Sequence, residues 1–404
     1  MLRKTYNKNY LAQIIFLTIL LCTLNTSCEK DDNIKVDKIL NIDFSGQVNK
    51  IETLGYYSLS DAVTFLQLAN IPNKTETTNG FYLYRITYKT KNYNNNDLWV
   101  SGLIAIPDCK EIKGLVSYQH GTIADRNYAP SKPSPDEGIG IASVFAGNGY
   151  ILLAPDYIGL GISTEVPTYL HNSSTVNAAI DFIEIGAVVL NNFTSGKNSN
   201  LYLVGYSQGG SATAGIHREL EINNPTGLIL KGSACVAGAF NLKDISLHYA
   251  IENKSTFYLG YVANSYAKIY NQSLSTIIKN EYVDLIPTLF DGSKTAEYIL
   301  NALPTEPDEL YTQSMLDDIN NGNINWFTTA LGQNETYMWK PNTKIRLFYG
   351  SKDKDVSPQD AISAYNYMIN IGGNVEIINT GDFDHVGSLL NSLPEIQKWF
   401  NNTK

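Results

Sequence analysis

The stretch Gly205-Tyr206-Ser207-Gln208-Gly209 decides the fold of this 404-residue chain. An apolar run, 201–204, leads into it, and a segment of small residues, 210–215, leads out of it. This order predicts a strand, a sharp turn and a helix, the setting in which a G-x-S-x-G turn exposes a nucleophilic serine. The serine of such a turn takes strained backbone angles, so the positions around it need residues without a Cβ atom. Ser207 is therefore the candidate nucleophile.

Short apolar runs alternate with longer helical patterns on both sides of this turn. Such alternation predicts βαβ units and a mostly parallel sheet with helices on both faces, hence an α/β fold. Two earlier runs with alternating polarity predict an antiparallel pair at one edge of the sheet. The predicted parallel strands are 114–118, 150–154, 201–204, 228–239, 345–349 and 375–378, and the antiparallel pair is 82–88 and 98–106.

The composition changes twice along the chain, and each change predicts a boundary. Residues 28–80 are polar and poorly patterned, apart from a short helix that Ser60-Asp61 would cap, so we expect an N-terminal tether and arm. Residues 241–339 are rich in Tyr, Asn, Ile and Leu at helical spacing. They predict a helical lid insertion over the carboxyl edge of the sheet, and the core is then formed by residues 81–240 and 340–404.

The first 27 residues hold three bases, no acids and an apolar run at 11–24, which is too short for a comfortable membrane span. They are typical of a signal peptide. Thr26-Ser27-Cys28 resembles the lipobox of a bacterial lipoprotein, and the acidic residues 29–32 resemble an export tag. This resemblance implies lipid attachment at Cys28, a membrane anchor and an outer-membrane or cell-surface location. The alternative is a soluble protein, secreted or periplasmic, that is cleaved nearby.

The charge of the chain disfavours some classes of partner, and its cysteine content excludes one class of fold. Without residues 1–27 the chain has 27 bases against 39 acids, a formal net charge of −12. This charge disfavours nucleic acid and anionic headgroups as partners and favours a neutral substrate. Only Cys109 and Cys235 remain after Cys28, so the chain is not a disulfide scaffold.

A serine nucleophile needs a base, and the chain has five histidines. His385 follows the last predicted strand, in a loop that reaches the Ser207 turn. His217 lies ten residues beyond Ser207 on the same predicted helix, about 15 Å along its axis, and is too far away. His120 ends an early strand, and His171 and His248 lie in irregular or lid sequence. We therefore predict that His385 is the base.

The acid that orients this histidine is expected after the preceding strand, in the segment 350–358. Asp353 and Asp355 both lie there, ahead of a helix that Ser357 would cap and Pro358 would open. Asp353 is favoured by its position between Gly350 and the valine that follows. Asp355 is then expected to be a solvated partner of Lys352 or Lys354.

The order Ser207, Asp353, His385 resembles that of the α/β-hydrolase superfamily, and more closely its secretory-lipase-like esterases with a helical lid. The segment 350–357 is similar to the family signature G-x-x-D-x-x-V-P, with Ser357 in place of the final proline. The segments 118–122 and 154–161 resemble the family's oxyanion loop and a structural loop. The resemblance covers roughly residues 80–404. It implies that the backbone N–H groups of Thr122 and Gln208 bind the oxyanion of the reaction intermediate.

The sequence therefore predicts a serine hydrolase of small-molecule or lipid carboxylic esters, of the lipase or carboxylesterase type. Two alternatives on the same fold stay open, an esterase that removes acetyl or feruloyl groups from glycans and a serine peptidase. A catalytically idle binding protein is disfavoured because all three positions of the triad are filled. No cofactor is expected, since residues 159–161 lack the third glycine of a dinucleotide site and no phosphate-binding loop occurs. Neither histidines nor cysteines show metal-ligand spacing, so we expect no metal site.

Overall fold

The computed structural model describes residues 39–72, 75–132 and 136–403. The predicted signal peptide and Cys28 lie outside these residues. Nine strands form one sheet in the order β1-β2-β3-β5-β4-β6-β7-β8-β9. Their bounds are β1 (Val48–Tyr57), β2 (Phe81–Lys91), β3 (Asp97–Pro107), β4 (Leu115–Gln119), β5 (Ile151–Pro155), β6 (Asn200–Tyr206), β7 (Ile229–Val236), β8 (Ile345–Tyr349) and β9 (Val375–Asn379).

The sheet is parallel from β5 through β9 and antiparallel from β1 to β5. The predicted mixed sheet, with an antiparallel pair formed by β2 and β3, is confirmed. The prediction that this pair forms the edge is wrong, because β1 pairs with β2 and lies outside it. The polar composition of β1 has a physical reason: an edge strand is only partly buried, so it does not need a continuous apolar run.

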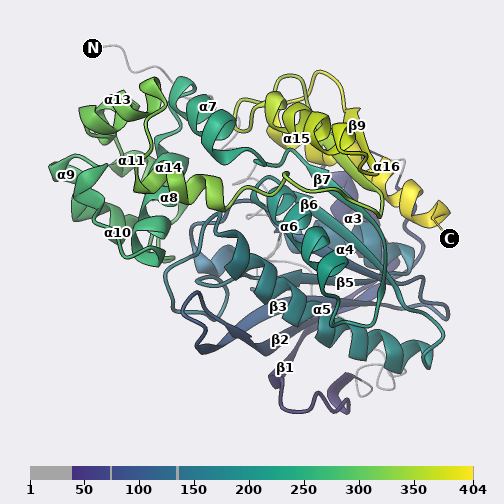
Figure 1. Ribbon diagram of the computed structural model, residues 1–404. Helices are drawn as coiled ribbons and strands as arrows, with labels where there is room; N and C mark the ends of the chain where they lie inside the picture. Colours follow the sequence, from purple (N-terminus) through teal and green to yellow (C-terminus); the bar gives the residue numbers. More distant parts are fainter. Residues whose placement is uncertain (1–38, 73–74, 133–135, 404) are drawn as a thin grey trace.

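Helices cover both faces of the sheet and complete a three-layer core (Figure 1). The buried apolar residues of α3 (Leu59–Leu68), α4 (Asp136–Phe145) and α16 (His385–Asn402) pack on one face. Those of α5 (Asn172–Thr194) and α6 (Gln208–Ile222) pack on the other, beside α15 (Pro358–Asn370). Two short 3-10 helices are η2 (Arg126–Tyr128) and η3 (Ala146–Asn148).

Helix α3 begins earlier than predicted, and helix α5 is long and apolar. The cap of α3 is Ser58, which accepts from Asp61 N–H, so the predicted cap at Ser60-Asp61 is two residues too late. Helix α5 is long and apolar enough to cross a membrane by length and composition alone. However, 67% of its apolar window is buried within the protein, and its side chains pack against the sheet. We therefore interpret α5 as a core helix.

Between β7 and β8 the chain forms a separate helical layer, which we call the insertion (residues 241–339). Figure 1 shows it to one side of the sheet, in green. Its buried side chains form a core of their own, and its described residues form no strand beyond the bridge between Ile278 and Tyr311. Its helices are η4 (Leu242–Ser246), α7 (Leu247–Glu252), α8 (Thr256–Ile269), η5 (Leu274–Thr276), α9 (Asn280–Val283), α10 (Leu285–Leu289), α11 (Ala296–Ala302), α12 (Pro307–Leu310), α13 (Gln313–Asn321) and α14 (Trp326–Gln333).

A buried carboxylate joins the insertion to the core. Asp360, in the first turn of α15, accepts hydrogen bonds from the backbone N–H groups of Phe240 (3.1 Å) and Asn241 (2.9 Å). It also accepts from the hydroxyl of Ser246. Burial raises the pKa of Asp360 from 3.8 to about 7, although these donors oppose the rise, and the nearby charge of Glu335 adds to it. The insertion thus begins on a group whose charge changes near neutral pH.

This raised pKa predicts how stability depends on pH. The pKa of Asp360 is higher in the folded chain than in the unfolded chain. Its contribution to the free energy of unfolding is therefore fully present below about pH 4 and is lost as the pH rises through 7. Between pH 5 and 8 the loss of this contribution should lower the free energy of unfolding by about 3 kcal/mol. Asp360→Asn keeps an oxygen for the two N–H donors and removes the titration. Urea unfolding at both pH values should show a smaller fall in the variant, and an equal fall would contradict the assignment.

Candidate active site

Ser207 lies at the turn between β6 and α6, where the backbone is strained. Its φ of 57° and ψ of −121° are rare for a residue with a side chain. Its N–H donates to the carbonyl of Val236 on the neighbouring strand (2.9 Å). A Cβ atom on Gly205 would collide with the carbonyl of Gly209, and one on Gly209 would collide with the carbonyl of Gln119. The turn therefore has the tight packing that the sequence predicted.

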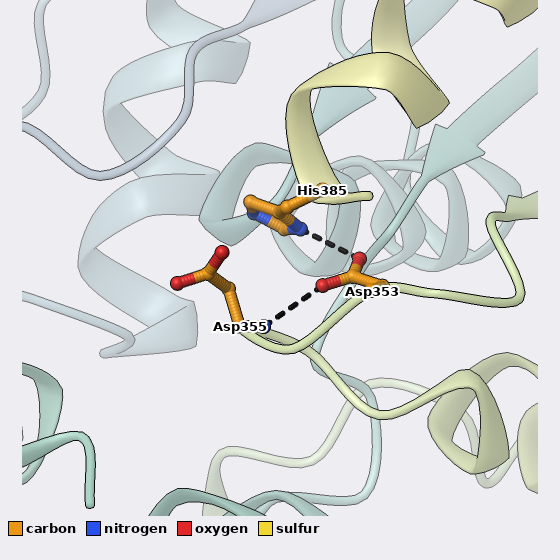
Figure 2. Close-up of side chains that lie close together, drawn as sticks. All are labelled: Asp353, Asp355 and His385. Atoms are coloured by element: carbon orange, nitrogen blue, oxygen red, sulfur yellow. Dashed lines mark hydrogen bonds and ion pairs between the residues drawn. The ribbon is translucent and has the colours of Figure 1, made fainter. Parts of the chain in front are cut away.

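The structure brings Ser207, His385 and Asp353 into one chain of hydrogen bonds. His385 is the first residue of α16, and its Nε2 lies 2.8 Å from the Ser207 Oγ. Its Nδ1 lies 2.7 Å from the Asp353 Oδ2, a contact shown in Figure 2. Since a carboxylate only accepts, Nδ1 carries the proton and Nε2 is left to accept from the serine hydroxyl. All three residues are buried.

Asp353 is held in place by its own loop. Its Oδ1 accepts from the backbone N–H groups of Asp355 (2.9 Å) and Val356 (3.0 Å), so both carboxylate oxygens are engaged. The predicted cap is confirmed as well: Ser357 accepts from the N–H of Gln359, and Pro358 is the first residue of α15.

Of the five histidines, all of them in the described residues, His385 alone is hydrogen-bonded to the Ser207 hydroxyl. His217 is fully buried and pairs with Glu221 (3.1 Å), and both ring nitrogens of His120 contact backbone carbonyls. His171 bonds to the hydroxyl of Ser174, and His248 is exposed.

Asp355 is exposed, as predicted, but the predicted lysine partner is wrong. Lys352 pairs with Asp382 (3.2 Å), whereas Asp355 accepts a hydrogen bond from the hydroxyl of Tyr258 in α8 (3.2 Å). Asp355 is exposed to solvent and lines the chamber described below. Loss of hydration raises its pKa, His385 opposes the rise, and the charge of Asp353 adds to it. The correction has a physical reason: α8 of the insertion brings the hydroxyl of Tyr258 to this carboxylate, a contact that no local feature of the loop indicates.

The loop after β4 lies beside the turn at Ser207, which we call the elbow. A Cβ atom on Gly121 would lie 3.7 Å from the Cβ of Ser207. The N–H of Gly121 donates to Glu137 (3.4 Å), and the hydroxyl of Thr122 bonds to that of Tyr169 (3.1 Å). In the described part of the chain, no hydrogen bond uses the backbone N–H of Thr122 or of Gln208. Both donors are thus available to an oxyanion.

An apolar chamber opens next to Ser207, between the elbow and the insertion. It encloses about 630 Å³ of space outside the protein atoms, including open solvent at its mouth. The insertion contributes most of its wall, and the loop after β8 contributes Asp355, Val356 and Ser357. The larger aliphatic side chains of the wall are Leu170, Leu242, Leu247, Leu259, Val262, Leu331 and Val356.

The possible ligand atoms of Asp353, Asp355 and His385 lie within 4.8 Å of one another, which is close enough for a shared metal ion (Figure 2). Their hydrogen bonds argue against that use. Both ring nitrogens of His385 and both oxygens of Asp353 are already engaged, so a metal ion would have to break the contacts to Ser207 and to the loop. We interpret the cluster as a hydrogen-bonded network.

Solved structures resemble this chain over most of its length. A candidate hydrolase from Legionella pneumophila is 26% identical, with a TM-score of 0.81 over 88% of this chain and 98% of its own. The rice cell wall degrading esterase LipA from Xanthomonas oryzae is 22% identical, with a TM-score of 0.79 over 89% and 99%. Lipase A from Candida antarctica is 15% identical, with a TM-score of 0.64 over 91% and 84%.

This chain has the α/β-hydrolase fold. The fold class predicted from the sequence is confirmed. The sequence matches no family model and no curated protein.

Three tyrosines of the insertion contact the loops of the site and were not predicted. The hydroxyls of Tyr249 and Tyr261 donate to the carbonyls of Asp353 (2.7 Å) and Ile123 (2.9 Å), and Tyr258 contacts Asp355. The richness of the insertion in tyrosine was the available signal. It could not tell which of these tyrosines face the site.

The packing at the elbow predicts a large difference between two glycine substitutions. Gly209→Ala should lower the free energy of unfolding by about 3 kcal/mol, because the added methyl meets the backbone of Gln119 and His120, which cannot rotate away. Gly140→Ala is the matched control in α4, where a Cβ atom meets nothing within 4 Å. It should be neutral or stabilising by up to about 1 kcal/mol. Chemical unfolding compares them, and equal stability would mean that the elbow is looser than described.

Proposed function

We propose that this protein is a serine hydrolase of carboxylic esters, of the lipase or carboxylesterase type. The observation that carries the proposal is the hydrogen-bonded chain from Ser207 through His385 to Asp353, at a strained turn beside an apolar chamber. Ser207 attacks the acyl carbon, and His385 takes its proton at Nε2. Asp353 keeps the proton on Nδ1 and stabilises the imidazolium that forms.

The remaining groups stabilise the intermediate and hold the substrate. The backbone N–H groups of Thr122 and Gln208 donate to the oxyanion, and each such donor lowers the barrier by roughly 3 kcal/mol. The aliphatic wall of the chamber favours an apolar acyl part, because transfer of apolar surface out of water is favourable. A neutral ester also suits the net charge of the chain.

Ser207→Ala should lower the hydrolysis of p-nitrophenyl esters by about 10⁴-fold or more, because no other group can form the acyl-enzyme. Ser211→Ala is the matched control: this buried serine lies one turn further along α6 and bonds to Thr336. It should keep most of the activity.

Rates for a series of rising acyl length, with acetyl and feruloyl glycan esters and aminoacyl anilides beside it, separate the ester hydrolase from the glycan esterase and the peptidase. Activity that survives in Ser207→Ala would overturn the mechanism.

We also propose that the protein is exported and anchored by a lipid on Cys28. The proposal rests on the sequence of residues 1–32, which lie outside the described residues. Cys28→Ser should move the protein from the detergent-extracted membrane fraction to the soluble fraction, whereas Cys109→Ser should not. A wild-type protein that is already soluble, with its amino terminus beyond Cys28, would contradict the anchor.

A further inference from the structure

The proposed mechanism fixes where the alcohol part of an ester must lie. When the acyl-enzyme forms, the leaving oxygen receives its proton from Nε2 of His385, so it must come within hydrogen-bond reach of that atom. Nε2 lies 2.8 Å from the Ser207 Oγ. The alcohol therefore occupies the side of the acyl carbon that faces His385. This step rests on the proposed function.

Asp355 lies on that same side. One of its carboxylate oxygens is within 4.8 Å of a ring nitrogen of His385, and the residue lines the chamber together with Ser207. Figure 2 shows its side chain extending beside the His385 ring, away from the contact between His385 and Asp353. Its backbone N–H donates to Asp353 and its carboxylate accepts from Tyr258, so backbone and side chain are each held by a hydrogen bond.

The carboxylate of Asp355 has capacity for more hydrogen bonds than it makes. An ionised carboxylate offers about four acceptor positions, and among the described residues the hydroxyl of Tyr258 is the one side-chain donor to Asp355. Within the described residues no ion pair reaches it, since the neighbouring Lys352 pairs with Asp382. Nearby protein atoms raise its pKa, although the residue stays exposed to solvent. It is the acidic group of the chamber wall, which is otherwise mostly aliphatic and aromatic.

We propose that Asp355 selects the alcohol part of the substrate, by accepting a hydrogen bond from a second hydroxyl or an ammonium group carried close to the ester oxygen. The acyl part then lies against the aliphatic wall. Two carboxylates two positions apart would then act on different parts of the substrate. Asp353 acts on the ester through His385, and Asp355 binds the donor group directly. Asp355 is thus a specificity residue, with no part in the proton transfer itself.

Two pairs of butyrate esters with nearly identical shapes test this selection. Hydroxyethyl butyrate is compared with propyl butyrate, and protonated dimethylaminoethyl butyrate with isopentyl butyrate. In the wild-type enzyme kcat/KM should favour the ester with the donor by about tenfold in at least one pair, the effect of a hydrogen bond to a charged group. Each ratio compares two substrates on one enzyme, so general effects on His385 and differences in the folded fraction cancel.

Three variants identify the group responsible. Asp355→Leu should bring the favoured ratio close to one. Asp355→Asn keeps a carbonyl acceptor without the charge, so it should retain a preference for the hydroxyl and lose one for the ammonium. Asp382→Asn is the matched control, because this exposed carboxylate of a neighbouring loop pairs with Lys352 and Ser351 outside the chamber. Both of its ratios should equal those of the wild type.

The outcomes separate this inference from the proposed function. Wild-type enzyme that hydrolyses all four esters without discrimination, or Asp355→Leu that keeps the preference, overturns the role of Asp355 and leaves the esterase intact. Wild-type enzyme that hydrolyses none of the four, and no p-nitrophenyl ester either, overturns the proposed function, and the role of Asp355 fails with it.

Discussion

The rest of the site depends on one strained turn, at Ser207. A φ of 57° with a ψ of −121° costs roughly 1 to 3 kcal/mol, and such a conformation persists only where its surroundings enforce it. Here a hydrogen bond to Val236 holds the turn from one side, and backbone packing against Gly205 and Gly209 holds it from both ends. The strain has a use. It points the serine hydroxyl toward His385 while the N–H of Gln208 stays free at the start of α6.

The insertion does more than cover this turn, because one of its helices contacts both loops that flank the turn. Tyr258 and Tyr261 are three residues apart in α8 and therefore share a face of the helix. Tyr258 reaches the loop of Asp355, and Tyr261 reaches the carbonyl of Ile123 next to Thr122. Tyr261 also stacks on Tyr169, whose hydroxyl bonds to Thr122. A movement of α8 would therefore disturb the candidate acid loop and the candidate oxyanion loop together.

Sequence reasoning succeeded where local patterns carry the information. Buried parallel strands must be apolar, so their runs were visible, and the chain order placed Ser207, Asp353 and His385 after three different strands of the sheet. It failed where partners are distant or burial is partial. The edge strand β1 has too few buried residues to show a pattern. Asp355 depends on Tyr258, which lies 97 positions earlier in the chain, and no local feature of the loop reports that contact.

Asp353 and Asp355 are two positions apart, and their environments differ in the number of hydrogen-bond donors. Asp353 receives two backbone N–H groups and the imidazole Nδ1–H, which together replace the water it lost on burial. Asp355 receives one phenol hydroxyl, and its pKa rises. The donors of Asp353 belong to the protein, so this carboxylate can hold the histidine whether or not substrate is bound. Asp355 has fewer such donors, so a substrate that carries one into the chamber can bond to it.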